Sequence, residues 1–148
     1  TGVDIPVGVY KRLCTIPNIA GVKEATTDIG KILQIRYECE DNLPIWCGND
    51  DMTVPVLSLG GKGVISVVSN LLPQEGQAMA MAALDGDFDT AAELQRRLYS
   101  LTKLLQCQVN PVPVKAAMKC MGYDCGGCRL PLTELGEEET QKLKEYFS

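Results

Sequence analysis

Three short apolar segments recur roughly every 20 residues in the first half of the chain, and each is followed by a segment of helical pattern. The expected strands cover residues 19–25, 43–47 and 64–68. The run over 19–25 lacks the alternation of a half-exposed strand and suits a parallel strand buried on both faces. Strands that alternate with helices form βα repeats with right-handed crossovers. The pattern therefore predicts an α/β fold.

The spacing of apolar residues predicts helices over 6–14, 29–38 and 52–59, with Asp28 as the N-cap of the second. After residue 72 the strand signals stop, and four further helices are expected, over 73–84, 88–106, 114–121 and 137–147. We therefore divide the chain into βα units over 1–72 and a helical C-terminal region over 73–148. A closed (β/α)8 TIM barrel needs eight strands and about 250 residues. The pattern fits the last three strands of such a barrel and a helical extension.

The composition is that of a soluble globular protein, with 45% hydrophobic residues, 22% charged residues and a net charge of −5. No basic stripe is present, which argues against a nucleic-acid partner. No apolar run reaches the roughly 18 residues that a membrane helix needs, so we expect no membrane association. The chain has no histidine, which excludes catalytic triads and zinc sites that depend on imidazole.

Seven cysteines are scattered at irregular spacing, which is typical of reduced thiols in a cytoplasmic protein. Cys125 and Cys128 have CxxC spacing, but no second pair lies at the distance that a zinc ribbon requires. A thiol-dependent redox or metal-binding function is therefore a minor alternative. We predict no metal site.

Lys23 stands at the end of the first expected strand, in the run Ile19-Ala20-Gly21-Val22-Lys23-Glu24-Ala25-Thr26. Burial would lower the pKa of a lysine there and leave a neutral amine that can attack a carbonyl. The alternative is that Lys23 is simply the first exposed residue past the strand end, with its stem lying along the surface. The residues alone leave both possibilities open.

Five motifs in register resemble the dihydrodipicolinate synthase family, a family of class I pyruvate-dependent aldolases that includes N-acetylneuraminate lyase. They are Gly21-Val22-Lys23-Glu24-Ala25-Thr26, Gly48-Asn49-Asp50-Asp51, Gly60-Gly61-Lys62-Gly63-Val64-Ile65-Ser66-Val67, Asn110-Pro111-Val112-Pro113-Val114-Lys115 and Leu130-Pro131-Leu132. The resemblance covers essentially all 148 residues and matches the C-terminal half of the family's sequence. It implies a (β/α)8 barrel with a C-terminal helical extension, in agreement with the strand count.

The resemblance implies that Lys23 forms a Schiff base with pyruvate, at the carboxyl end of a barrel strand where such active sites lie. The iminium is an electron sink that turns the pyruvate methyl group into an enamine, which attacks the aldehyde of aspartate semialdehyde. The implied enzyme is a lyase of lysine and diaminopimelate biosynthesis, with no cofactor beyond the covalent Schiff base.

The same resemblance implies that Gly48, Asn49 and Ile65 bind substrate. Gly48 would let the backbone approach a ligand closely, and many family members have Asp at the position of Asn49. Ile65 would act only through its main-chain carbonyl, so we also expect its side chain to be an ordinary core isoleucine. Asp50 and Asp51 are interpreted as helix caps.

The family's proton-relay tyrosine, its paired threonines and its substrate-guiding arginine all lie upstream of the matching lysine, in the half that this sequence lacks. We therefore expect an N-terminal half of the barrel as a partner, and little activity from this chain alone. Full-length relatives are commonly homotetramers, which predicts a homo-oligomer. The alternatives are a non-catalytic half-barrel that serves association, or a related pyruvate aldolase such as N-acetylneuraminate lyase.

Overall fold

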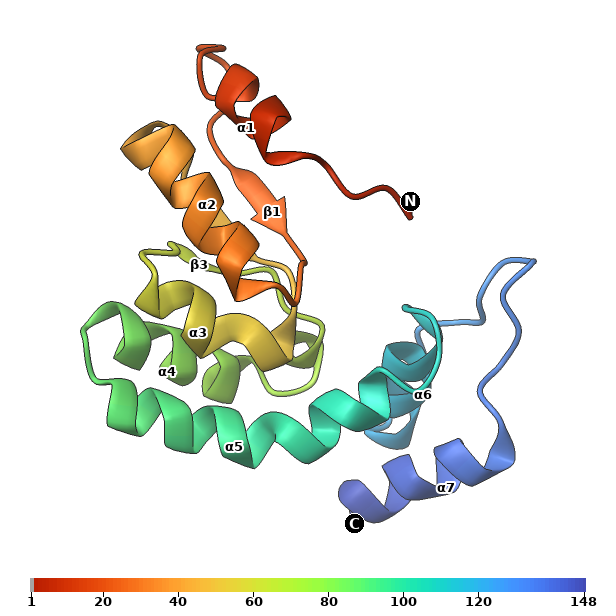
Figure 1. Ribbon diagram of the computed structural model, residues 1–148. Coiled ribbons are helices and arrows are strands. Elements are labelled where there is room, and N and C mark those ends of the chain that lie inside the picture. Colours follow the sequence, from red (N-terminus) through yellow and green to blue (C-terminus); the bar gives the residue numbers. More distant parts are fainter. Residues whose placement is uncertain (1) are drawn as a thin grey trace.

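The computed structural model describes residues 2–148 (Figure 1). Its α-helices are α1 (Val7–Leu13), α2 (Ile29–Cys39), α3 (Thr53–Ser58), α4 (Pro73–Leu84), α5 (Phe88–Leu105), α6 (Val112–Cys120) and α7 (Glu137–Tyr146). The strands are β1 (Val22–Glu24), β2 (Ile45–Cys47) and β3 (Gly63–Val64). Short 3-10 helices cover η1 (Glu40–Asn42), η2 (Asp50–Met52) and η3 (Val68–Asn70).

The three strands form one parallel sheet in the order β1-β2-β3, as the βα pattern predicts. In the pairing register Lys23 lies opposite Trp46, and Trp46 lies opposite Gly63. These three residues therefore form a row across the sheet. Each strand is followed by a helix, so β1-α2, β2-α3 and β3-α4 are three successive βα units.

Helices α1, α2 and α3 cover one face of this sheet only (Figure 1). The core between them consists of side chains that are almost completely buried: Tyr10, Ile32, Ile35, Cys39, Leu43, Ile45, Cys47 and Val56. The opposite face carries Lys23, which is exposed, and Trp46, which is half-buried. The expectation that the Lys23 strand is buried on both faces is therefore wrong for the described residues, because the helices pack on one side of the sheet.

The strands are shorter than the sequence pattern predicts, and the third is the clearest correction. Residues 64–68 were expected to be strand, but β3 ends at Val64 and Val68 begins η3. The Asp50 carboxylate accepts hydrogen bonds from the main-chain N–H groups of Val67 (2.9 Å) and Val68 (3.2 Å). These bonds turn the chain out of the sheet in spite of its β-branched residues.

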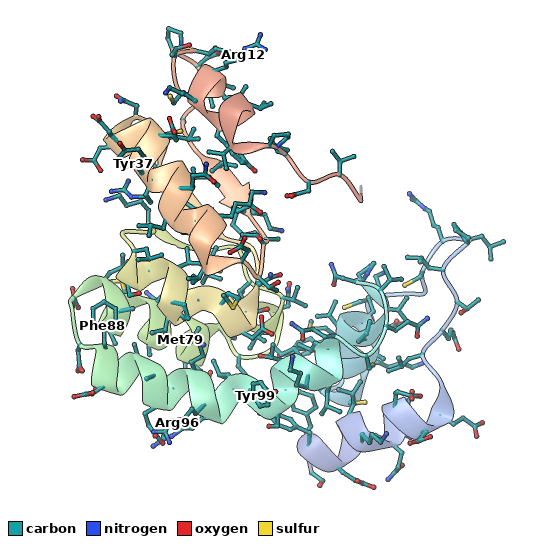
Figure 2. All side chains as sticks on the ribbon, viewed as in Figure 1. Arg12, Tyr37, Met79, Phe88, Arg96 and Tyr99 are labelled. Atoms are coloured by element: carbon teal, nitrogen blue, oxygen red, sulfur yellow. The ribbon has the colours of Figure 1, made fainter. Side chains whose placement is uncertain are left out.

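The helices after residue 72 agree more closely with the sequence. Helix α4 has the predicted bounds, whereas α6 begins two residues earlier than predicted because Pro113 is accommodated in its first turn. Met79 of α4 is buried in the core that α5, α6 and α7 share, while Tyr37 and Arg96 project from the outer sides of α2 and α5 (Figure 2). Helix α4 also packs on α3, so a boundary at residues 72/73 stays a prediction.

Within residues 2–148, none of the helices combines the length and the apolar character that crossing a bilayer requires.

Candidate functional site

Three consecutive residues after β2 join the carboxyl ends of all three strands. The N–H of Gly48 donates to the carbonyl of Glu24 (2.8 Å), at the end of β1. The side-chain amide of Asn49 donates to the carbonyl of Ala25 (2.6 Å), just beyond it. Asp50 holds the turn that follows β3 through its carboxylate. Residues 48–50 therefore fix the edge of the sheet at which Lys23 lies, and we call them the rim segment.

Lys23 belongs to β1 and its side chain is exposed on the open face of the sheet. Of the two possibilities that the sequence left open for this lysine, the described residues show the exposed one. Gly48 lies directly against it, since a Cβ at position 48 would stand 2.9 Å from Cε of Lys23 and 2.8 Å from Cβ of Ala25. The absence of a side chain at Gly48 thus leaves the space that the Lys23 stem occupies.

Glu24, the next residue, points to the covered face and is 8% exposed. Its carboxylate accepts hydrogen bonds from the Tyr10 hydroxyl (2.5 Å) and the main-chain N–H of Thr26 (2.9 Å). It also forms an ion pair with Lys31 at 3.1 Å, and Lys31 reaches Asp4 as well. Helices α1 and α2 and the turn after β1 therefore converge on one carboxylate behind Lys23.

The titration of these groups follows from that contact. Burial, followed by the hydrogen bond and the charge of Glu24, raises the pKa of the Tyr10 hydroxyl, so Tyr10 stays protonated and donates. Burial disfavours the charged form of Lys31, but hydrogen bonds to Asp4 and Glu24 outweigh it and raise its pKa. Both partners of Glu24 are therefore hydrogen-bond donors at neutral pH.

Ile65 follows β3 and its N–H donates to the carbonyl of Cys47 (2.8 Å). Its side chain is 49% exposed, so the expectation of an ordinary core isoleucine is wrong. The reason is the open sheet face, which no helix of the described residues covers. A shallow cavity of about 290 Å³ lies nearby, and its lining includes Trp46, Ser66, Ser69 and Gln77.

Asp50 and Asp51 do not cap the helix that they begin, because no side chain of theirs bonds within η2. Asp50 instead caps η3, as its contacts with residues 67 and 68 show. The Asp51 carboxylate lies 3.3 Å from Nζ of Lys103 on α5. Asp50 is therefore a helix cap, as predicted, but it caps η3 and not the helix that it begins. Val67, to whose N–H it bonds, lies 17 residues later in the sequence.

Replacing Asn49 with aspartate is expected to lower the free energy of unfolding by about 2 kcal/mol at pH 7. The Asn49 amide donates to the carbonyls of Ala25 and, at 3.4 Å, Thr26. A carboxylate cannot donate and would face the two carbonyl oxygens, which favours its protonated form. The loss should therefore shrink as pH falls from 7 toward about 4, the ordinary pKa of an aspartate, because the folded variant takes up the proton at a higher pH than the unfolded chain and donates again.

Urea denaturation at pH 7 and pH 3.5 measures this effect, with Asn70→Asp as the control. The Asn70 amide also donates to a carbonyl, that of Val67 at 3.0 Å, but the residue is exposed. We expect a smaller loss there because water can replace the bond. Equal losses for the two variants would contradict the role of Asn49 in the rim segment.

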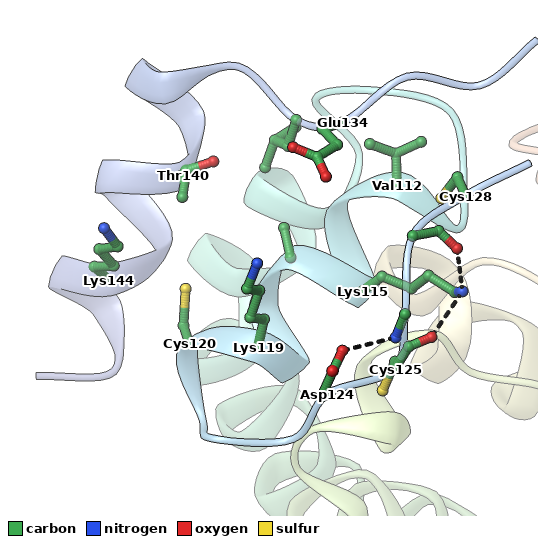
Figure 3. A pocket seen from close by; sticks show the side chains of 14 residues that line it. Val112, Lys115, Lys119, Cys120, Asp124, Cys125, Cys128, Glu134, Thr140 and Lys144 are labelled. Carbon is green, nitrogen blue, oxygen red and sulfur yellow. Dashed lines mark hydrogen bonds between the residues drawn. The ribbon is translucent and has the colours of Figure 1, made fainter. Parts of the chain in front are cut away.

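Cys125 and Cys128 lie far from this site, along a cleft of about 680 Å³ between α6, α7 and the loop that joins them (Figure 3). The Lys115 amine donates to the carbonyls of Cys125 (3.0 Å) and Gly127 (2.9 Å), and in Figure 3 the two cysteine side chains lie on opposite sides of that amine. Residues 2–148 contain no cluster of three or more His, Cys, Asp or Glu side chains arranged to hold a metal ion.

Comparison with known proteins identifies the family that has this fold and this arrangement of residues. The model of the dihydrodipicolinate synthetase family matches residues 1–148. The chain belongs to this family. A 4-hydroxy-tetrahydrodipicolinate synthase of Acetivibrio thermocellus is 42% identical over 98% of this chain and 49% of its own length.

Solved structures of family members superpose closely on the chain. A dihydrodipicolinate synthase from Aquifex aeolicus superposes with a TM-score of 0.94 and 38% sequence identity. The match covers 98% of this chain and 50% of the Aquifex aeolicus chain. The enzyme from Acinetobacter baumannii, in a complex with pyruvate, has a TM-score of 0.93 and 34% identity over 98% of this chain and 50% of its own. The resemblance to the dihydrodipicolinate synthase family and the partial (β/α)8 barrel are thereby confirmed.

The chain spans about half the length of the family members that it matches. Its three βα units are correspondingly part of the family's barrel, and the open sheet face is the side that a complete barrel would enclose.

Sequence reasoning missed the group behind Lys23. It assigned no role to Glu24, and none to Tyr10 beyond the expected helix over 6–14. The available signal was a buried-strand glutamate, which requires partners because an isolated buried carboxylate is costly. The partners lie on two different helices, 14 and 7 residues away in the sequence, and only the packing of those helices identifies them.

Proposed function

We propose that this chain supplies the Schiff-base-forming half of a 4-hydroxy-tetrahydrodipicolinate synthase, a lyase of lysine and diaminopimelate biosynthesis. The observation that carries the proposal is the position of Lys23, at the carboxyl end of β1, on the open sheet face and against Gly48. Membership of the family supports it, as does the pyruvate complex of the Acinetobacter baumannii relative.

In the proposed reaction the Lys23 amine attacks the keto carbon of pyruvate, and loss of water gives an iminium. The positive iminium nitrogen withdraws electrons, so the pyruvate methyl group loses a proton and becomes the nucleophilic carbon of an enamine. That carbon attacks the aldehyde of aspartate semialdehyde. The iminium itself is the electron sink, so the reaction as proposed requires no metal and no organic cofactor.

Three neighbours of Lys23 are proposed to bind substrate. Gly48 leaves room for the lysine stem and for a bound pyruvate. Ile65 offers its main-chain carbonyl at the end of β3, beside the β2 carbonyl to which its N–H is bonded. Asn49 acts from the rim segment, where its amide ties the loop after β1 to the loop after β2.

We propose the N-terminal half of the same barrel as the partner of this chain. It would cover the open face that carries Lys23 and Trp46 and would pair the edges of β1 and β3. It would also enclose the lysine in a site of lower dielectric constant, so we expect little turnover from this chain by itself. By analogy with full-length relatives, we propose a cytoplasmic homo-oligomer, with a tetramer as the expected form.

The test is chemical trapping of the Schiff base. Residues 1–148 are fused behind the N-terminal half of the Acetivibrio thermocellus relative, and we call this fusion the completed barrel. The completed barrel and the chain alone are incubated with pyruvate and borohydride, digested and mapped by mass spectrometry. We expect a reduced pyruvate adduct on Lys23 of the completed barrel, loss of tryptic cleavage at that residue, and a much weaker adduct on the chain alone.

Lys23→Ala and Lys62→Ala are the paired variants, since both lysines are exposed and lie on the sheet or next to it. Lys23→Ala should lose the adduct and Lys62→Ala should keep it. A completed barrel that is folded by circular dichroism but bears no adduct on Lys23 would refute the Schiff-base role. That outcome would favour the alternative of a half-barrel that serves association, for which the open sheet face is the supporting observation.

A further inference from the structure

Cys14 and Cys39 lie at the same end of the packed helix pair α1 and α2. Cys14 is the C-cap of α1 and Cys39 is the last residue of α2. An ion pair of 2.7 Å between Lys11 and Glu38 joins the two helices next to them. Cys39 is buried in the core cluster under α1, and Cys14 is half-buried and packs against the same cluster. The Cys14 thiol donates to the carbonyl of Lys11 (3.1 Å), and Cys14 is one of the neighbours that shift the pKa of Cys39.

We propose that Cys14 and Cys39 are a dithiol site, which a small-molecule disulfide oxidises to an intramolecular disulfide between α1 and α2. Cys39 is 1% exposed, so solvent reaches the pair through Cys14. The CxxC pair that the sequence singles out is the weaker candidate, because the Lys115 amine holds the loop that carries both cysteines through the carbonyls of Cys125 and Gly127 (Figure 3). The inference does not depend on the proposed synthase function.

The reaction balances with oxidised glutathione as the probe. The Cys14 thiolate attacks one sulfur of glutathione disulfide, forms a mixed disulfide and releases one glutathione thiolate. The Cys39 thiolate then attacks the Cys14 sulfur and releases the second glutathione. The two protein thiols are oxidised, the glutathione disulfide is reduced to two thiols, and the protons lost by the cysteines pass to those thiols.

The second step should be the slow one and should depend on pH. Burial, followed by the neighbouring Cys14 thiol, raises the pKa of the Cys39 thiol to about 11. The charged groups that face it are Glu38, which adds to this rise, and Lys11, which opposes it. The thiolate fraction of Cys39, and with it the rate of closure, should increase about tenfold per pH unit between pH 7 and 9.

The proposed disulfide between Cys14 and Cys39 would join α1 and α2, the two helices that contact the Glu24 carboxylate behind Lys23. Tyr10 belongs to α1 and Lys31 to α2, and both contact Glu24. A disulfide between these helices would restrict their separation and should raise the midpoint of thermal unfolding by about 5–10 °C.

The test is peptide mapping of the whole chain after incubation with glutathione disulfide at pH 8, with free thiols alkylated before digestion. Trypsin releases Leu13–Lys23, which carries Cys14. A second, glutamate-specific protease cleaves after Glu38 and Glu40 and so separates Cys39 from Cys47. We expect the Cys14 and Cys39 peptides as one disulfide-linked species that dithiothreitol separates. No substitution is needed, so this readout does not depend on the folding of a variant.

Cys14→Ser should remove the linked species, whereas Cys128→Ser, which removes a thiol that is also half-buried, should leave it unchanged. Cys14 and Cys39 recovered as alkylated peptides, while the exposed thiols have reacted with glutathione, would overturn the proposal. A linked species that joins Cys39 to a cysteine other than Cys14 would overturn it as well.

Discussion

Glu24→Ala is expected to lower the free energy of unfolding by about 3 kcal/mol. The substitution removes the acceptor of the Tyr10 hydroxyl and one of the two carboxylate partners of the Lys31 ammonium. Both donors stay in the protein interior, and Lys31 keeps only its contact with Asp4, whose side chain is 82% exposed. The loss is large because leaving a buried donor or charge without a partner costs its full desolvation.

Urea denaturation followed by the fluorescence of Trp46, the single tryptophan, measures this loss. Trp46 lies opposite Lys23 in the sheet and therefore reports on the same region. Glu138→Ala is the control, because its ion pair with Lys142 lies on the exposed surface of α7 and should leave the midpoint at the parent value. A Glu24→Ala midpoint equal to that of the control would mean that the buried carboxylate does not hold α1 and α2 in place.

Gly48→Ala is expected to slow formation of the Lys23 adduct in the completed barrel by about 100-fold. A methyl group at this position would stand 2.8 Å from Cβ of Ala25 and 2.9 Å from Cε of Lys23, and 3.2 Å from the backbone Cα of Ala25. The lysine stem is the softest of these neighbours, so the amine moves away from its place at the end of β1. Misplacement of a reacting group by about 1 Å is enough for a rate loss of this size.

Borohydride trapping over a time course gives the rate, with Gly127→Ala as the control. A methyl group at Gly127 meets no atom within 4 Å, and that glycine lies in the loop beside the distant cleft. The control should therefore form the adduct at the parent rate. An unchanged rate for Gly48→Ala would mean that the glycine is not required for the position of Lys23.

Local signals in the sequence predicted those elements whose boundaries are decided by nearby residues. Asp28 caps α2 because its own carboxylate reaches the N–H groups of Gly30 and Lys31, two and three residues ahead. The proline at the start of α4 acts within a single turn in the same way. The end of β3 is different, because Asp50 decides it from 17 residues away. No property of residues 64–68 themselves reveals that bond.

The same distinction, between features decided by nearby residues and features decided by distant ones, applies to the candidate site. The position of Lys23 at the end of a βα strand could be predicted, because it follows from the periodicity of the chain and from the motif around it. The surroundings of the lysine could not, because the partners of Glu24 depend on how α1 and α2 pack on the sheet. The solvent exposure of Lys23 was left open and that of Ile65 was missed, because a strand pattern does not reveal whether both faces of the sheet are covered.

The rim segment has a consequence for the thermodynamics of ligand binding. Gly48 and Asn49 bond to the backbone at the end of β1, and Asp50 bonds to the backbone after β3, so the loops after the three strands have little conformational freedom relative to one another. The entropy lost in ordering them is a cost of folding, and a ligand that binds at this edge does not have to meet it again. A small molecule that makes few contacts, such as a keto acid, gains most in affinity when the loops at this edge are already ordered before it binds.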